Sequence, residues 1–116
     1  MFKKIFDFLI GKAVNVFIPG THEGDCTQKY CVLKTGTTVQ LQNFSSQRKF
    51  YLIYVYVPAG EYIDLEDYVN EIKTYLDELY PMLMFTGNET SPFLETGIKA
   101  YMISLEYRVN IRRERL

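Results

Sequence analysis

One sequence feature does most to limit the folds open to this chain. A strand with apolar side chains on both faces is followed at once by an amphipathic helix. In residues 50–57, FYLIYVYV, both alternating sets of side chains are apolar or aromatic. Strands of this kind are covered on both sides. We expect the following helix to cover one side, and the N-terminal helix or a second subunit to cover the other.

The amphipathic helix is predicted over residues 64–80. Asp64 occupies the N-cap position, where its carboxylate can accept hydrogen bonds from the amides of the first turn. Pro81 ends the helix, because proline disfavours helical geometry in the residue before it. Strand and helix make a central unit, residues 50–80, on which the other elements are expected to pack. Apolar residues recur at helical spacing on one face: Leu65, Tyr68, Val69, Ile72, Tyr75, Leu76 and Leu79.

An N-terminal helix is predicted over about residues 2–14, with Phe2, Ile5, Phe6, Leu9 and Ala13 on one face. It is too short to span a bilayer, and its basic face would bind anionic lipid only weakly. We therefore expect this helix to dock on the domain and predict no membrane partner.

The segment between this helix and residue 50 is predicted to hold a strand at residues 30–34 and a possible second strand at 37–41, with a turn at Gly36 between them. Residues 42–49 are polar and are interpreted as a loop. A short apolar strand is expected at residues 82–85.

Residues 100–113 are the clearest strand in the chain, because apolar and polar side chains alternate throughout. At about 3.3 Å per residue the strand reaches roughly 45 Å, so its end is expected to project past the domain. The apolar set, which we assign to the core, is Tyr101, Ile103, Leu105, Tyr107, Val109 and Ile111.

These elements predict one α+β domain over residues 1–116. The N-terminal helix and one long amphipathic helix are expected to pack on its sheet. A chain of 116 residues, 47% of them hydrophobic, is large enough to bury a core without disulfides or a metal.

Charge is almost balanced overall but unevenly placed. The formal net charge of -1 argues against a general nucleic-acid binder, whose affinity comes from neutralising phosphates. Residues 61–80 carry seven acids and one lysine, whereas residues 99–116 carry five bases and two acids. Regions of opposite sign suit head-to-tail self-association. The candidate subunit-interface residues are therefore Glu66, Glu71, Asp77, Glu78, Arg108, Arg112, Arg113 and Arg115.

His22, Cys26 and Cys31 are the residues that suggest a metal site. Their spacing is H-x3-C-x4-C. These three residues are one ligand short of the four in a structural zinc site, and the usual close cysteine pair is absent from the pattern. We predict no metal, no cofactor and two reduced thiols.

No enzyme is predicted either. His22 is the sole histidine, and no nucleophile elbow, oxyanion loop or phosphate-binding glycine run accompanies it. The acids of residues 64–80 are interpreted as a solvated helix face rather than as an acid-base pair, so no catalytic residue is assigned.

The order of elements resembles a known family. It comprises an N-terminal helix, YCVL at residues 30–33 after a His-Glu-Gly loop, the aromatic strand, LEDYV at 65–69 and a closing EYRVNIRR at 106–113. This pattern resembles the tail terminator proteins of long-tailed phages, also called tail completion or tail-to-head joining proteins.

The resemblance implies an α+β fold with a mostly antiparallel sheet of about four strands. It implies a structural virion protein of the tail-neck region, assembled in the host cytoplasm. It implies a homo-oligomeric six-fold ring that stops growth of the tail tube and joins it to the head connector or stopper protein. Candidate docking-loop residues are then His22, Glu23, Asp25, Gln47 and Arg48.

Two alternatives stay open at this point. One is another phage neck or head-closure protein. The other is a small nucleic-acid-binding α+β domain, with Tyr51 or Tyr54 stacking on bases and the C-terminal arginines on phosphates. In a ring, the arginines either line a lumen through which DNA passes or pair with the acidic helix of the next subunit.

Overall fold

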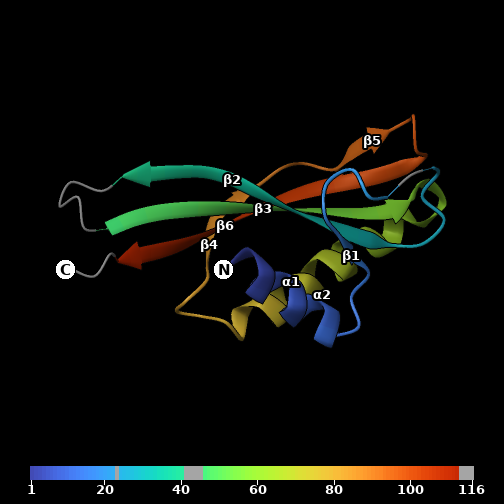
Figure 1. Cartoon of the computed structure of the whole chain (residues 1–116). Helices are drawn as coiled ribbons and strands as arrows, with labels where there is room; N and C mark the ends of the chain where they lie inside the picture. The colour runs from blue at the N-terminus through green and yellow to red at the C-terminus, as the bar shows by residue number, and fades with distance from the viewer. Residues whose placement is uncertain (23, 41–45, 113–116) are drawn as a thin grey trace.

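The computed structural model of this chain describes residues 1–22, 24–40 and 46–112. Within them, each of the two α-helices is followed by a run of three strands, and the molecule is elongated (Figure 1). The elements in chain order are α1 (Phe2–Gly11), β1 (Val16–Phe17), β2 (Tyr30–Gln40), β3 (Ser46–Pro58), the 3-10 helix η1 (Ala59–Asp64), α2 (Leu65–Asp77), β4 (Met84–Glu89), β5 (Phe93–Glu95) and β6 (Ala100–Arg112).

The described strands form one sheet in the order β1-β2-β3-β6-β4, with β5 also paired to β6. Only β1 and β2 pair in parallel; the other pairings are antiparallel. The predicted α+β class is confirmed, but the prediction of about four strands was wrong, since this sheet has six. β1 and β5 are too short for an alternating pattern to show in the sequence.

β3 and β6 are the long central pair of the sheet, in unbroken register from Ser46↔Arg112 to Pro58↔Ala100. The predicted loop at 42–49 was therefore wrong for residues 46–49, which are strand because β6 continues far enough to pair with them. Residues 41–45 and Arg113 lie outside the described residues.

β2 is one strand rather than two strands separated by a turn. Its register against β3 shifts between Thr35 and Thr38, which marks a bulge at Gly36. A Cβ at Gly36 would lie 3.1 Å from the carbonyl oxygen of Phe50, so the glycine permits a close approach of two strands. The turn predicted at this residue was wrong for that reason.

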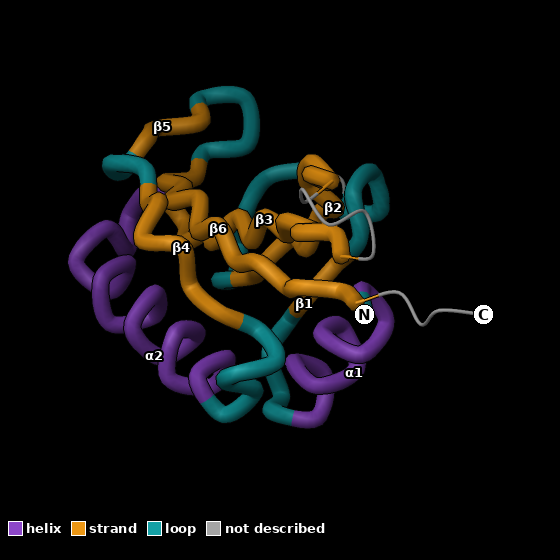
Figure 2. The backbone as a smooth tube through the Cα atoms, turned by 90° about the vertical axis from the view of Figure 1, so that its left-hand side faces the viewer, coloured by secondary structure: helices purple, strands orange, loops and turns teal. Residues whose placement is uncertain are grey.

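Both helices lie on the same face of the sheet, as Figure 2 shows. The buried side chains of β3 and β6 that point to this face are Tyr51, Ile53, Val55, Val57, Ile103, Leu105, Tyr107 and Val109. The other face of β3 carries half-buried side chains, so the expectation that the N-terminal helix would cover it was wrong, while the alternative, a second subunit, stays a prediction. The core beneath the helices includes Ile5, Leu9, Leu33, Tyr51, Ile53, Val55, Val57, Leu65, Ile72, Leu76, Leu83, Leu105 and Tyr107.

The two helices differ from prediction at their ends. α1 stops at Gly11, and Ala13, with φ of 61°, has left the helix. Asp64 is the N-cap of α2, but its side chain makes no capping hydrogen bond, because the 3-10 helix η1 leads directly into α2. α2 ends at Asp77, before Pro81. Its predicted apolar face is confirmed, with Leu65, Tyr68, Val69, Ile72 and Leu76 buried.

Three strands continue well past the helices at one end of the molecule, which measures 53 × 25 × 25 Å (Figure 1). We call this projection the basic arm and define it as residues 37–40, 46–49 and 109–112. The predicted projection of the C-terminal strand is thus observed as a three-stranded feature. η1 and the start of α2 lie at the opposite end of the sheet (Figure 1).

Candidate functional site

The predicted acidic interface residues lie on the solvent side of α2, where Glu66, Glu71, Asp77 and Glu78 are all exposed. Glu78 forms an ion pair with Lys12 of α1 at 3.0 Å. Glu71 accepts a hydrogen bond from the Tyr75 hydroxyl at 2.8 Å, and this bond raises the pKa of Tyr75. α2 therefore presents an acidic surface, on which Glu78 also links the end of α2 to Lys12 and Glu71 bonds within α2.

The predicted basic residues lie elsewhere. Arg108 is on β6, paired with Phe50 and Met84, and its side chain points to the face that the helices do not cover. Its Nε atom is buried and has no hydrogen-bond partner among the described residues. Arg112 ends β6 in the basic arm, while Arg113 and Arg115 lie outside the described residues. Within one chain, then, the sheet separates Arg108 from the acidic surface.

The predicted docking-loop residues do not gather at one place. His22 stacks on Tyr30, with ring centroids 4.0 Å apart, and Tyr30 stacks on Tyr56 at 4.7 Å. Asp25 pairs with Lys99 at 3.3 Å. The loop is thus fastened to the uncovered face of the sheet. Glu23 lies outside the described residues.

Gln47 and Arg48, expected in the same kind of loop, belong to β3 in the basic arm. Arg48 precedes Tyr56 by eight residues on this strand, a separation of roughly 26 Å at the usual rise. The two groups of proposed docking residues therefore lie toward opposite ends of the sheet.

The structure does not bring His22, Cys26 and Cys31 together. Tyr30, which stacks on His22, and Cys31 are successive strand residues and point to opposite faces. Cys26 packs with Tyr30, whereas Cys31 is in the core under α2 and donates to the Tyr68 hydroxyl at 3.6 Å. Among the described residues, no three His, Cys, Asp or Glu side chains are grouped to hold a metal.

Buried thiol and phenol groups make the folded state less stable at alkaline pH. Burial raises the pKa of Cys31 from 9.0 to about 12, and burial also raises the pKa values of Tyr68 and Tyr107. The folded chain retains protons that the unfolded chain releases, so stability is complete below about pH 9 and falls as the pH rises toward 12.

We expect urea unfolding curves recorded between pH 8 and pH 11 to show this fall. The variant Cys31→Ala, which removes one titrating group, should have a shallower dependence than the parent chain. An unfolding free energy that stays constant over this interval would contradict the burial of these groups.

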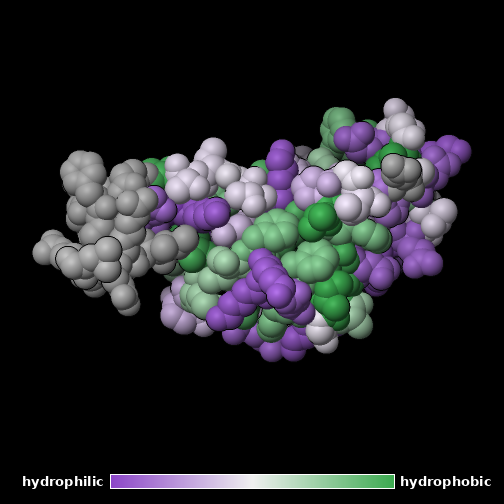
Figure 3. Space-filling model, viewed as in Figure 1, coloured by the Kyte–Doolittle hydropathy of each residue, from purple (hydrophilic) through white to green (hydrophobic). Residues whose placement is uncertain are grey.

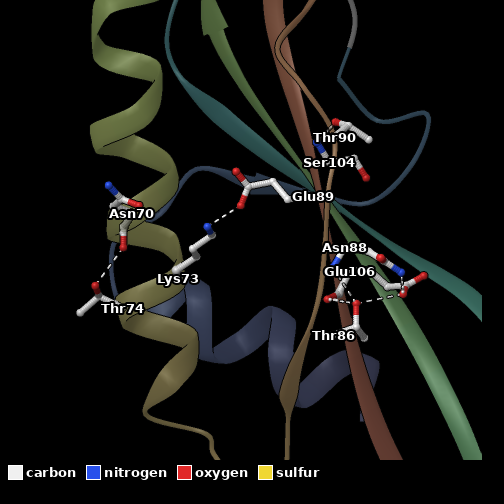
Figure 4. Close-up of polar contacts among 9 residues, drawn as sticks. All are labelled: Asn70, Lys73, Thr74, Thr86, Asn88, Glu89, Thr90, Ser104 and Glu106. Atoms are coloured by element: carbon white, nitrogen blue, oxygen red, sulfur yellow. Dashed lines mark hydrogen bonds and ion pairs between the residues drawn. The ribbon is translucent and has the colours of Figure 1, made fainter.

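A groove that the sequence did not predict lies between α2 and the segment joining β4 to β5. It has a volume of about 740 Å³, and its lining includes Tyr62, Ile63, Glu66, Asn70, Pro92 and Ile103. Lys73 of α2 points across it to form an ion pair with Glu89 (Figure 4). The backbone amide of Ser104 donates to Thr90 Oγ1 at 2.9 Å, which fixes the opposite wall.

Local sequence rules predict the opposite of what is seen at the rim of this groove. An apolar residue just before an N-cap ordinarily packs against the first turn of its helix. Ile63 holds that position in the acidic run EYIDLED, yet it is 89% exposed. Only the structure shows that the residue is left outside.

The uncovered face carries a polar cluster on β4 and β6. Glu106 Oε1 accepts from Thr86 Oγ1 at 3.0 Å and from Asn88 Nδ2 at 2.9 Å (Figure 4). These bonds fasten β4 where its register against β6 shifts. We interpret the cluster as support for the sheet edge.

Hydropathy differs along the surface seen in Figure 3. Hydrophobic side chains are seen between α1 and the strands, with hydrophilic ones across α1 itself, and further hydrophilic side chains lie at the end opposite the basic arm. Neither α1 nor α2, nor any other helix in the described ranges, is long and apolar enough to cross a membrane.

Comparison with models of known protein families finds no match. No protein with curated annotation matches the chain.

Proposed function

We propose that this chain is a structural protein of a long-tailed phage virion, a tail terminator that assembles head-to-tail into a six-fold ring. The ring caps the tail tube and joins it to the head connector. One observation carries the proposal: a single elongated domain has an acidic helix surface on one side of its sheet and basic residues on the other side and in the projecting arm.

A ring of identical subunits needs a heterologous contact, in which one surface meets a different surface of the next copy. The acidic surface of α2 and Arg108 cannot meet within one chain, because the sheet lies between them. A neighbouring copy can bring such surfaces together. Each exposed ion pair contributes only about 0–1 kcal/mol, so the charges orient the copies while apolar contacts hold them.

Apolar side chains for such contacts are exposed at several places. Ile63, Phe93 and Tyr80 are each more than half exposed. Single exposed apolar side chains are common on monomers, so these residues supply contact points for the proposed assembly and are not by themselves evidence for it. The proposal therefore assigns a structural role, with no catalytic residue and no cofactor.

Nucleic-acid binding is a second candidate, and the placement of Tyr54 favours it. This tyrosine is half-buried on the sheet face that no helix covers in the described residues, and Arg108 is on the same face. Tyr51 is unsuited to stacking because it is buried under the helices. Affinity for single-stranded or duplex DNA that survives physiological salt would favour this candidate over the ring.

The proposed function is tested with a phage that lacks this chain. Electron microscopy should show tail tubes of uncontrolled length that fail to join heads. Purified protein added to such an extract should cap the tubes and restore joining. Tubes of normal length that already carry heads would contradict a terminator role, and a defect confined to the head side would indicate a head-closure protein instead.

A further inference from the structure

The lining of the groove beside α2 combines apolar and polar side chains, and one apolar residue at its edge is highly exposed. Leu65, Val69 and Ile103 line it and are buried, whereas Ile63 at its edge is 89% exposed. Tyr62, also in the lining, packs its ring 4.6 Å from that of Tyr101. A groove with apolar side chains, polar side chains and an exposed apolar rim can accept a segment of a protein partner.

The end of the molecule that holds this groove is acidic. Residues 61–72 contain five acids, namely Glu61, Asp64, Glu66, Asp67 and Glu71, and no base. Of these, Glu66 lines the groove itself; Lys73 and Glu89 line it too, but their charges offset each other in an ion pair. The partner is therefore expected to combine an apolar side chain with positive charge.

The basic arm of this chain has that chemistry. No acidic residue occurs from position 26 to position 60, and the arm contributes Arg48, Lys49 and Arg112. Val39 and Arg48 are cross-strand partners in β2 and β3, so they lie side by side on one face. Val39 is 45% exposed.

The arm and the groove cannot meet within one molecule. The arm projects at one end of a molecule 53 Å long, and η1 and the start of α2 lie at the other end (Figure 1). The occupant that fits the groove is therefore the arm of a second copy. Ile63 and Glu66 of one copy complement Val39 and Arg48 of the other in both polarity and charge.

We propose that the basic arm of each copy docks in the groove between α2 and the β4–β5 segment of the next copy. The inference rests on the proposed function and makes it more specific, because it names the two elements in contact. It assigns Val39 and Ile63 as the apolar anchors and Arg48 and Glu66 as the orienting pair.

Disulfide trapping tests this contact directly. Two cysteines bridge only when their Cα atoms are within about 7 Å, so a Val39→Cys/Ile63→Cys variant can cross-link only between copies. Cys26 and Cys31 are buried, and burial raises the pKa of each thiol, so they remain slow to react. After mild oxidation and alkylation, a non-reducing gel should show a ladder that ends at six copies.

The matched control is Val39→Cys/Ile10→Cys, since Ile10 is 51% exposed but lies on α1, outside the groove. This pair and the single Val39→Cys variant should stay uncross-linked. Equal cross-linking of the control pair, or none in the Val39→Cys/Ile63→Cys variant, would overturn the docking proposal.

The outcome also separates this inference from the ring. If native mass spectrometry shows a six-copy ring but residues 39 and 63 do not cross-link, the ring proposal stands and the arm contact is refuted. If the ladder of cross-linked species continues beyond six copies, the arm contact is supported and the closed six-copy ring is refuted.

A second variant measures the energetic role of the rim. Ile63→Asp should raise the Kd for assembly about tenfold or more, because it places a like charge beside Glu66 and removes an anchor. Its melting temperature should not change, since the side chain is exposed. Ile10→Asp is the matched control, and an equal effect of both variants would contradict the specific role of the groove.

Discussion

Replacing Leu76 with alanine is expected to lower the free energy of unfolding by about 2–5 kcal/mol, the range for a buried leucine that leaves a cavity. Leu76 is fully buried in the core between α2 and the sheet. Close-packed surroundings relax only partly around such a cavity. Urea denaturation at neutral pH measures the change, with the midpoint and slope fitted separately.

Leu79→Ala provides the matched control on the same face. Leu79 is only partly buried and follows the end of α2. The same chemical change should therefore cost less there. If the two variants lost equal stability, the packing assigned to α2 would be incorrect.

Reversing Arg112 and Arg113 to glutamate is expected to raise the Kd for assembly about 10- to 100-fold at low salt, without unfolding the monomer. Arg112 ends the basic arm, and each reversal turns an attraction with the acidic surface into a repulsion. Sedimentation velocity measures assembly, and circular dichroism shows whether the monomer remains folded.

A second set of reversals, Glu66→Lys with Glu71→Lys, should restore assembly of the arginine variant. Glu78 is unsuitable for this rescue because it already pairs with Lys12 within the chain. If the arginine reversals left the ring intact but abolished head joining or DNA retention, the basic end would face the lumen or the connector. The contact between subunits would then lie elsewhere.

The sequence predicted the elements with strong periodicity. The apolar face of α2 repeats from Leu65 to Leu76, and the alternation of β6 continues from Ile103 to Val109, so burial of both sets followed directly. Each pattern comes from one buried face, and a buried face can be predicted from the spacing of apolar residues along the sequence.

Which face the helices cover could not be predicted from β3. Tyr54 and Tyr56 are apolar enough to suggest burial, but tyrosine has a polar hydroxyl and can stay half-buried on an uncovered face. Periodicity records that two sets of side chains are apolar. It does not record which set meets a helix.

Long-range pairing explains the remaining differences. Residues 46–49 are polar and were predicted as loop, yet β6 supplies a strand for them to pair with. Gly36 was predicted as a turn, yet its lack of a Cβ allows the bulge that keeps β2 continuous against Phe50. Both outcomes depend on a neighbour distant in sequence.

The candidate site was predictable in charge but not in geometry. Acidic and basic segments are visible in the sequence, and the structure places the acidic residues on exposed α2 and Arg108 across the sheet. The groove beside Ile63 combines η1, α2 and the β4–β5 segment, so no single stretch of sequence contains it.

Native mass spectrometry of the purified chain, over a series of protein and salt concentrations, tests the ring most directly. We predict a species of six copies of the 13.6 kDa chain that grows with protein concentration and declines as salt screens the charges. A species that remains a monomer at every concentration and every salt level would contradict head-to-tail assembly.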